Sequence, residues 1–300
     1  MTLSPADSAS SVRQTFPPDD SQILAASVDA VRAAGGLLLG RFPPLPLPAT
    51  PEQVVAALRA NDAASLDVLR GLLEAACPTA GWVEDELADG VLPDGDWWVV
   101  DPVEGNINHI HGLRDWAVTA TLVRDNVAVL TAVHLPLTGT TYTALRGGGA
   151  FQDGRRLQTS SKTDLRAALV GTGQASPRET TTTFSSIGRS VAAMLDAALV
   201  VRVSVPATLQ LIELAAGRMD VFWQHSAVRS GLLAGALLVA EAGGTVSAID
   251  GQPWTLASAD FLAGTPALHA SAAAVLAPFA TSPRDLQPAT AAGGAPGSTS

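Results

Sequence analysis

The sequence predicts a layered protein of the α+β or α/β class, in which helices and strands come in alternating blocks. Two helical regions come first, a block of strands follows, and strands then alternate with helices towards the end of the chain. With 300 residues, of which 47% are hydrophobic and 15% charged, the chain is long and apolar enough to bury a sizeable core.

Helical spacing of apolar residues defines the first two elements. Residues 21–41 carry Ile23, Val28 and Val31 at this spacing, and residues 51–76 repeat it with valines and leucines. Prolines at positions 43, 44, 46 and 48 separate the two regions. Because proline fixes the backbone and lacks an N–H donor, we expect a loop there.

Strands are predicted next, and several of them end in polar residues. Trp82-Val83 and Trp97 to Val100 are short apolar runs that acidic residues follow at once. Residues 116–143 alternate as paired strands do, with a turn signal at Asp125-Asn126. The threonines at 180–183 are typical of a loop. The remaining elements are predicted as strands at 168–171 and 221–223 and as helices at 209–216 and 230–242.

The charge balance excludes several classes of partner. The chain has 18 basic and 28 acidic residues, so its net charge is −10 with histidine neutral. Such a chain repels nucleic-acid phosphates and anionic membranes, and we expect neither as a partner. The single cysteine, Cys77, cannot form an internal disulfide or a Cys-based zinc site. The start shows no signal-peptide pattern, and no run of about 18 apolar residues occurs, so a cytoplasmic protein is expected.

Composition also divides the chain. Both ends are rich in small and polar residues without apolar periodicity, so residues 1–20 and 282–300 are predicted to be disordered tails. Between them, residues 21–160 form a predicted N-terminal half that carries a cluster of acidic residues. Residues 161–281 form a predicted C-terminal half of alternating strands and helices.

The acidic cluster is the most informative segment. A buried strand leads into Asp101, and Pro102 and Gly105 are expected to force a tight turn that brings Asp101 and Glu104 together. Hard cations such as Mg²⁺ bind oxygen ligands, and such a turn also offers a backbone carbonyl, here that of Val103. The cluster therefore predicts a binding or catalytic site at the end of this strand.

At this segment the sequence resembles the inositol monophosphatase family, the magnesium-dependent phosphatases of sugar and cyclitol phosphates. Asp101-Pro102-Val103-Glu104-Gly105-Asn106-Ile107-Asn108 is similar to the family signature Asp-Pro-x-Asp-Gly-Thr-x-Asn. Four further motifs are similar to the family's and occur in the family's order. One precedes the signature and three come after it, namely Glu84-Asp85, Gly149-Ala150-Phe151 with Gly154, Gly217-Arg218-Met219-Asp220 and Glu241-Ala242-Gly243-Gly244. The resemblance implies an αβαβα layered sandwich and a homodimer.

The resemblance also implies a metal centre that this chain retains only in part. A first site would use Glu84, Asp101 and the carbonyl of Val103. A second site would share Asp101 and add Glu104, which stands where the signature has a second aspartate. It would also need an aspartate from the start of the last long helix, and that position holds Gly231. We therefore expect one Mg²⁺ site at most, and a site without metal is the alternative.

Other family positions have changed as well. Asn106 replaces the threonine that orients the attacking water, and Gln224 replaces a glutamate that contacts substrate hydroxyls. Residues 205–208 replace a glycine-containing turn. Asp62 is the candidate for the upstream aspartate that pairs with the signature threonine.

Some residues could take over the chemistry. Asp101, Glu104, Asn106 and His109 are the candidate catalytic residues, with His109 beside Glu104 as an acid–base pair that titrates near neutral pH. The alternative for His109 is an ordinary hydrogen-bonding histidine. The candidate substrate-binding residues are Asn108, His111, Gln224, His225 and Arg229. For Arg229 the alternative is a solvated residue at a helix start.

These observations leave three hypotheses. The first is an enzyme that keeps the family fold but carries out an elimination, a cyclisation or an isomerisation on a small polar metabolite, in a setting such as specialised biosynthesis. The second is a magnesium-dependent phosphomonoesterase of a sugar or cyclitol phosphate with an altered metal set. The third is a non-catalytic binding or partner subunit.

Overall fold

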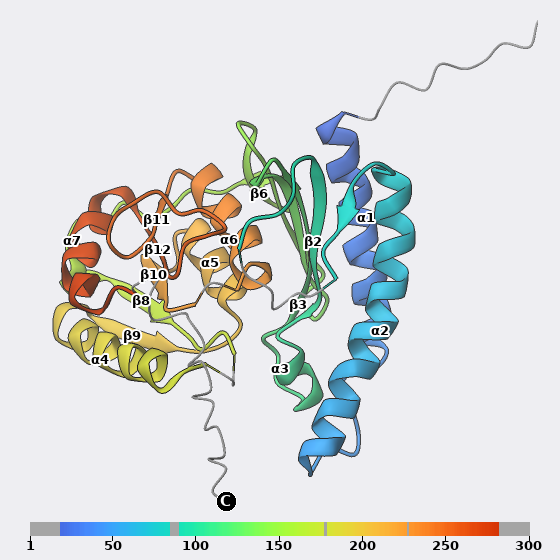
Figure 1. Ribbon diagram of the computed structural model, residues 1–300, viewed down its shortest axis with the longest axis horizontal. Helices are drawn as coiled ribbons and strands as arrows, with labels where there is room; N and C mark the ends of the chain where they lie inside the picture. Colours follow the sequence, from blue (N-terminus) through green and yellow to red (C-terminus); the bar gives the residue numbers. More distant parts are fainter. Residues whose placement is uncertain (1–18, 85–89, 177–178, 227, 282–300) are drawn as a thin grey trace, which may run out of the picture.

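Two β-sheets alternate with three layers of helices (Figure 1). The computed structural model describes residues 19–84, 90–176, 179–226 and 228–281. Helices α1 and α2 cover one face of the first sheet, α5 and α6 lie between the two sheets, and α4 and α7 cover the far face of the second sheet. This arrangement confirms the predicted αβαβα sandwich. The predicted tails, apart from residues 19 and 20, lie outside the described residues.

The two N-terminal helices begin and end close to the predicted positions. They are α1 (Asp20–Leu39) and α2 (Pro51–Ala76). The side chain of Asp19 caps α1, and Thr50 caps α2 ahead of a proline at the first helical position. By length and composition α1 could cross a bilayer, and 39% of its apolar 18-residue window is buried inside the fold.

The first sheet has seven strands that follow one another in sequence order. The first two strands are parallel and all the others are antiparallel. The predicted turn at Asp125-Asn126 joins β3 to β4, and both residues have positive φ angles. The strands are β1 (Gly81–Trp82), β2 (Asp96–Glu104), β3 (Ala117–Arg124), β4 (Val127–Leu135), β5 (Thr140–Leu145), β6 (Gly149–Gln152) and β7 (Arg155–Arg156).

The end of β2 differs from the tight turn that the sequence predicted. The strand continues to Glu104, with a register shift between Asp101 and Glu104. The turn comes at Gly105, which has a φ of +80° and precedes the short helix α3 (Asn106–Ile110). A Cβ at Gly105 would lie 2.7 Å from the backbone oxygen of Asp115. Glycine is therefore required here both for the backbone angle and for the close approach.

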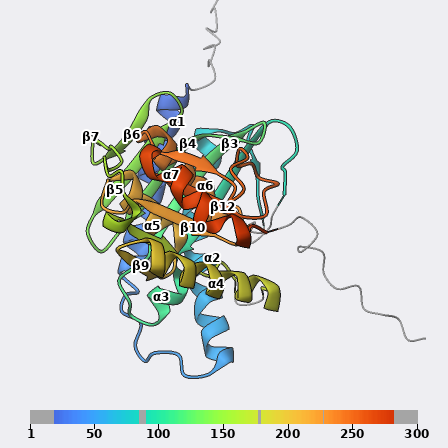
Figure 2. The same ribbon diagram turned by 90° about the vertical axis from the view of Figure 1, so that its left-hand side faces the viewer.

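The second sheet has five strands in the order β11-β12-β10-β8-β9. Helix α4 begins at the threonines that the sequence suggested were a loop, because Thr180 caps it by accepting from the N–H of Thr183. Figure 2 shows α4 and α7 over this sheet. The elements are β8 (Leu169–Thr172), α4 (Thr181–Ala197), β9 (Val200–Val203), α5 (Ala207–Ala215), β10 (Val221–Gln224), α6 (Ser230–Glu241), β11 (Thr245–Ser247), β12 (Phe261–Gly264) and α7 (Pro266–Leu276).

Helix α6 lies in the middle of the molecule. It is apolar on all sides, as expected for a helix packed between two sheets. It lies close against α5, and Gly235 allows this approach, because a Cβ there would collide with the side chain of Leu211, whose Cγ would be 2.9 Å away. The position of α6 matters for function because its first residues reach the cavity described below.

Replacing Gly235 with alanine tests this packing. Alanine normally favours a helix interior, but here we expect overpacking to lower the free energy of unfolding by about 1–3 kcal/mol. Chemical denaturation measures the change. The control is Gly188→Ala on the exposed side of α4, where nothing lies within 4 Å of a new Cβ and the effect should be neutral or stabilising. Equal effects at the two positions would contradict the packing described.

Candidate functional site

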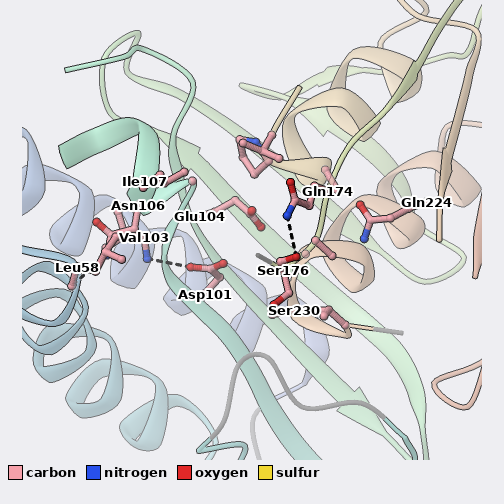
Figure 3. Close-up of a pocket in the computed structure, with 17 residues that line it drawn as sticks. Leu58, Asp101, Val103, Glu104, Asn106, Ile107, Gln174, Ser176, Gln224 and Ser230 are labelled. Carbon is pink, nitrogen blue, oxygen red and sulfur yellow. Dashed lines mark hydrogen bonds between the residues drawn. The ribbon is translucent and has the colours of Figure 1, made fainter. Parts of the chain in front are cut away.

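A cavity of about 440 Å³ opens where the end of β2 meets the loops before α5 and α6 (Figure 3). Residues from both halves of the chain line it. Of the predicted site residues, the structure brings together Asp101, Val103, Glu104, Asn106 and Gln224. The first four come from the end of β2 and the start of α3, and Gln224 comes from the end of β10.

Glu104 connects the two sides of this cavity. Glu104 is only 3% exposed, and its Oε2 accepts a hydrogen bond of 2.6 Å from the Oγ1 of Thr208 on α5. The hydroxyl of Thr208 also lies 3.0 Å from the backbone oxygen of Gly231 on α6. Thr208 is fully buried. Its hydrogen bond orients the Glu104 carboxylate and links the first sheet to α5.

Asp101 lies beside Glu104 on the cavity wall. Its Oδ1 accepts from the N–H of Val103 at 3.0 Å, and its own N–H donates to Thr119 at 3.1 Å. Burial raises the pKa of Asp101 well above its usual value, and the negative charges of Glu104 and Asp62 raise this pKa further. Two carboxyl groups thus share one cavity.

Asn106 is the centre of a hydrogen-bond network. Its Oδ1 accepts from Asn61 at 3.0 Å, and its Nδ2 donates to the backbone oxygen of Leu58 at 3.0 Å and to Asp62 at 2.5 Å. The bond to Asp62 confirms the pairing expected from the sequence. Burial raises the pKa of Asp62 to about 6. Both amide hydrogens of Asn106 are therefore in use, and an amide cannot pass on a proton as a hydroxyl can.

His109 is not beside Glu104 as the sequence predicted. It is fully buried, its Nε2 bonds the backbone oxygen of Leu38 at 3.1 Å, and its Nδ1 lies 3.0 Å from the side-chain nitrogen of Asn61. Since a carbonyl can only accept, Nε2 carries the proton and Nδ1 accepts from Asn61. Its ring packs between Phe42 and Trp116. His109 therefore holds α1, α2 and α3 together, and the predicted acid–base pair with Glu104 is wrong.

Four predicted substrate-binding residues also lie outside the cavity lining. Asn108 donates to the backbone oxygens of Asp115 and Val205, so it holds the loop before α5. His111 is exposed and bonds the backbone oxygen of Ile107. His225 is buried against Ser190, and burial lowers its pKa to about 4, so it is neutral at pH 7.

Arg229 is the fourth. It is not the solvated residue considered as the alternative, since it is only 5% exposed. Its Nη1 donates to the backbone oxygen of Gly90 at 2.6 Å, which ties the start of α6 to the segment before β2. Arg229 therefore positions a loop at the edge of the site. It was predicted to bind a substrate anion, but it does not line the cavity.

The predicted metal ligands are only partly assembled. Glu84 is exposed and pairs with Arg70 at 2.7 Å, away from the cavity lining, so the structure does not place it with Asp101. Gly231 lines the cavity and has no side chain to offer. Within the described ranges no three His, Cys, Asp or Glu side chains form a metal-binding group. Asp101, Glu104 and the Val103 carbonyl remain as donors that fit one cation. Magnesium stays a prediction.

Sequence reasoning missed three residues of the site, namely Thr208, Gln174 and Ser176. Thr208 orients Glu104, yet the chain alone shows only a threonine at a helix start. Gln174 and Ser176 form part of the wall, joined by a hydrogen bond from the Gln174 amide to the Ser176 backbone oxygen (Figure 3). The strand before Gln174 ends at Thr172, and polar residues directly after a buried strand are the signal that could have indicated them.

Comparison with known proteins agrees with this fold. The sequence pattern of the inositol monophosphatase family matches residues 19–279. This chain belongs to that family. Its fold is similar to the inositol monophosphatase from Anabaena (Nostoc) sp. PCC 7120, with a TM-score of 0.72 and 24% identity over 86% of this chain and 96% of that one. Mycobacterium tuberculosis SuhB gives a TM-score of 0.71 at 24% identity, over 87% of this chain and 98% of that one.

Relatives in the family carry different functional names. The inositol-1-monophosphatase of Rhizobium meliloti (strain 1021) is 32% identical over 198 residues, which cover 66% of this chain and 74% of that protein. The Nus factor SuhB of Pseudomonas aeruginosa PAO1 is 32% identical over 206 residues, which cover 68% of this chain and 76% of that protein. Membership of the family alone therefore leaves the function of this member to be argued from its own site.

A pair of histidine variants tests the assignment of His109 as structural. We expect His109→Ala to lower the free energy of unfolding by about 2–5 kcal/mol, because it leaves a cavity and unpaired polar groups in the core. The exposed neighbour His111→Ala should change it by less than about 0.5 kcal/mol. Denaturant unfolding of both variants measures this. A stable His109→Ala protein would contradict the assignment.

Proposed function

We propose that this member of the family is an enzyme that has exchanged two-metal hydrolysis of phosphate esters for acid–base chemistry on a small metabolite. The reaction class is an elimination, a cyclisation or an isomerisation. The observation that carries the proposal is Gly231, which lies at the cavity where the family resemblance places a metal-binding aspartate.

Gly231 matters because two-metal hydrolysis of a phosphate ester needs both ions. In two-metal hydrolysis the ions stabilise both the attacking and the leaving oxygen, and each is worth several kcal/mol of transition-state stabilisation. No carboxylate can reach the second ion from Gly231, and no neighbouring atom within 4 Å fills the place of a side chain there. The loss of one ion would slow hydrolysis by orders of magnitude, since ~1.4 kcal/mol is about tenfold in rate.

Asn106 supports the same conclusion independently. A residue that activates water must accept its proton or pass it to a base. The side-chain oxygen of Asn106 is occupied by Asn61, and its two hydrogens are occupied by Leu58 and Asp62. Asn106 therefore acts as a rigid hydrogen-bonding clamp on the cavity wall, and no water-activating hydroxyl stands at its position.

The groups that remain suit proton transfer. Glu104, oriented by Thr208, would take a proton from a carbon or a hydroxyl of the metabolite. Asp101, on the same wall, would return a proton at another atom, because neighbouring carboxyl groups commonly divide the acid and base roles. A single magnesium ion, if one binds, would be held by Asp101, Glu104 and the Val103 carbonyl and would polarise a substrate oxygen.

Two alternatives have specific support. A magnesium-dependent phosphomonoesterase is favoured by relatives named inositol-1-monophosphatase. A non-catalytic partner subunit is favoured by the relative named Nus factor SuhB. The net charge of −10 argues against direct contact with nucleic acid. The homodimer, the cytoplasmic location and the lack of a nucleic-acid partner stay predictions.

Substitution of Glu104 tests the catalytic proposal. Glu104→Gln keeps the shape and can still accept from Thr208, but it removes the base. We expect the metabolites of the host strain to change in the same way as when the gene is deleted, while the melting temperature of the purified protein stays near wild type. Mass spectrometry of cell extracts measures this. Glu74→Gln on the surface of α2 is the matched control. A normal metabolite pattern with Glu104→Gln would favour the non-catalytic subunit.

Restoring the carboxylate at Gly231 tests the metal argument. We expect the wild-type protein to release no phosphate from inositol 1-phosphate or other sugar phosphates with Mg²⁺. Gly231→Asp should bind Mg²⁺ about tenfold more tightly in calorimetry, an effect of ~1.4 kcal/mol. Gly188→Asp, on the exposed side of α4, should leave Mg²⁺ binding unchanged. Rapid, lithium-sensitive phosphate release by the wild type would establish the phosphatase instead.

A further inference from the structure

A second cavity, of about 420 Å³, lies where the edge of the first sheet meets the end of α5. The hairpin of β6 and β7 and the residues that follow β7 form one wall, and the loop after α5 forms the other. Figure 2 shows β7 at the rim of the molecule, beside β6. No acidic residue of the described chain lines this cavity, whereas five residues with N–H donors do, namely Gln152, Arg155, Arg156, Gln158 and Arg218.

This arginine-lined cavity is separate from the cavity beside Glu104. Thr208, which binds Glu104, lies in the first turn of α5, whereas Arg218 follows the last turn of the same helix. The 9 residues of α5 span roughly 13 Å, because the rise is ~1.5 Å per residue. The two cavities share no lining residue. A ligand in the arginine-lined cavity would therefore not contact Asp101 or Glu104.

Arg156 is held in place without using its hydrogen-bond donors. Its guanidinium carbon lies 5.8 Å from the centre of the Phe151 ring. The same carbon would lie 2.9 Å from a Cβ at Gly149, so the missing side chain of that glycine leaves the space that the guanidinium occupies. Contact with a ring uses the face of a guanidinium, while its N–H groups point outwards in the plane. The donors of Arg156 therefore remain available.

Arg218 is positioned by contacts on one side of its guanidinium. Its Nε donates to Glu213, and its Nη2 donates to Glu213 at 3.1 Å and to the hydroxyl of Tyr142 at 3.3 Å. Its Nη1 forms no hydrogen bond within the described residues. The preceding Gly217 fixes the loop, because a Cβ there would lie 2.9 Å from the backbone oxygen of Gln158. One pair of N–H donors thus stays free on a rigid support.

The positive charges of this cavity are not balanced by the protein. Neither Arg155 nor Arg156 forms an ion pair or a side-chain hydrogen bond with the described residues. Acids on neighbouring elements are engaged with the backbone. Glu241 accepts from two N–H groups at the start of β6, at 2.8 Å each, and Asp153 accepts from the N–H of Thr141 at 2.9 Å. Like charges held close together repel, so an anion between them would be favoured.

We propose that this cavity binds a small molecule that carries a phosphate or diphosphate group, through the guanidinium groups of Arg155, Arg156 and Arg218. A guanidinium presents parallel N–H donors that match the spacing of phosphate oxygens, and each such bond is strengthened by charge. The amides of Gln152 and Gln158 form no side-chain hydrogen bond within the described residues and supply further donors. The proposal does not rest on the proposed function, since the two cavities share no residue.

A matched pair of anions tests the chemistry of the ligand. Inorganic pyrophosphate and malonate each carry two acidic groups that one atom bridges, and they differ in having phosphates or carboxylates. Calorimetry with the full-length protein at pH 7, in EDTA to exclude divalent cations, measures both. We expect pyrophosphate to bind at least about tenfold more tightly, a difference of ~1.4 kcal/mol. No binding of pyrophosphate, or tighter binding of malonate, would overturn the proposal.

ADP tests the source of the phosphate, because it presents the diphosphate on an organic molecule. Tighter binding of ADP than of pyrophosphate would support an organic phosphate as the ligand, and tighter binding of pyrophosphate would support an inorganic one. Adenosine, which lacks the diphosphate, should not bind. Equal binding of adenosine and ADP would show that the phosphates are not recognised and would overturn the proposal.

Variants locate the binding of pyrophosphate. Arg155→Gln and Arg156→Gln should each weaken it at least about tenfold, or ~1.4 kcal/mol. Arg156→Lys keeps the charge but loses the paired donors, so it should recover only part of the affinity. The control is Arg59→Gln on the exposed side of α2, which changes the net charge by the same amount and should leave binding unchanged. All of these positions are exposed, so the melting temperature should stay near wild type.

Two outcomes of this series would overturn the proposal. Unchanged affinity in Arg155→Gln and Arg156→Gln would show that pyrophosphate binds elsewhere on the protein. An equal loss in Arg59→Gln would show that the anion responds to net charge and not to this cavity. Glu104→Gln, in the other cavity, should leave pyrophosphate binding unchanged, and a loss of binding there would assign the anion to that cavity instead.

Discussion

The hydrogen bond between Glu104 and Thr208 is the contact on which the site depends. It joins the last residue of β2 to α5, and so it connects the first sheet to the helices that separate the two sheets. Gly105 allows the same approach, because a Cβ there would lie 3.0 Å from the side chain of Pro206, which precedes α5. The cavity exists because the two halves of the chain meet at this point, and its carboxyl groups come from the strand that ends there.

Around this contact, polar residues divide into those that build the wall and those that face the cavity. The residues that build the wall form hydrogen bonds to the backbone and to one another; they are Asn61, Asn106, Asn108 and His109. Asp101, Glu104 and Gln224 face the space that a ligand would occupy. The two acids that the resemblance assigns to a metal centre thus lie at the cavity, while the asparagines and His109 around them hold structure.

Local patterns in the sequence predicted much of this fold. The apolar period of residues 21–41 and the turn at Asp125-Asn126 depend on near neighbours, and both predictions hold in the structure. The acids that were expected on a turn after the strand lie within β2 instead. Asp101 and Glu104 nevertheless share one cavity, as predicted. The role of His109 could not be predicted in this way, because its partner Leu38 lies 71 positions earlier in the chain. The position of Glu84 could not be predicted either, because its carboxylate pairs with Arg70 on α2.

The proposed function requires that Asp101 and Glu104 hold one cation at most. Diffraction from crystals grown with Mn²⁺ at saturating concentration, recorded at a wavelength where manganese scatters anomalously, tests this directly. We expect either no peak or one peak beside Asp101 and Glu104. Two peaks about 3.5–4 Å apart, the spacing of two-metal hydrolases, with the second ion beside Gly231, would contradict the account.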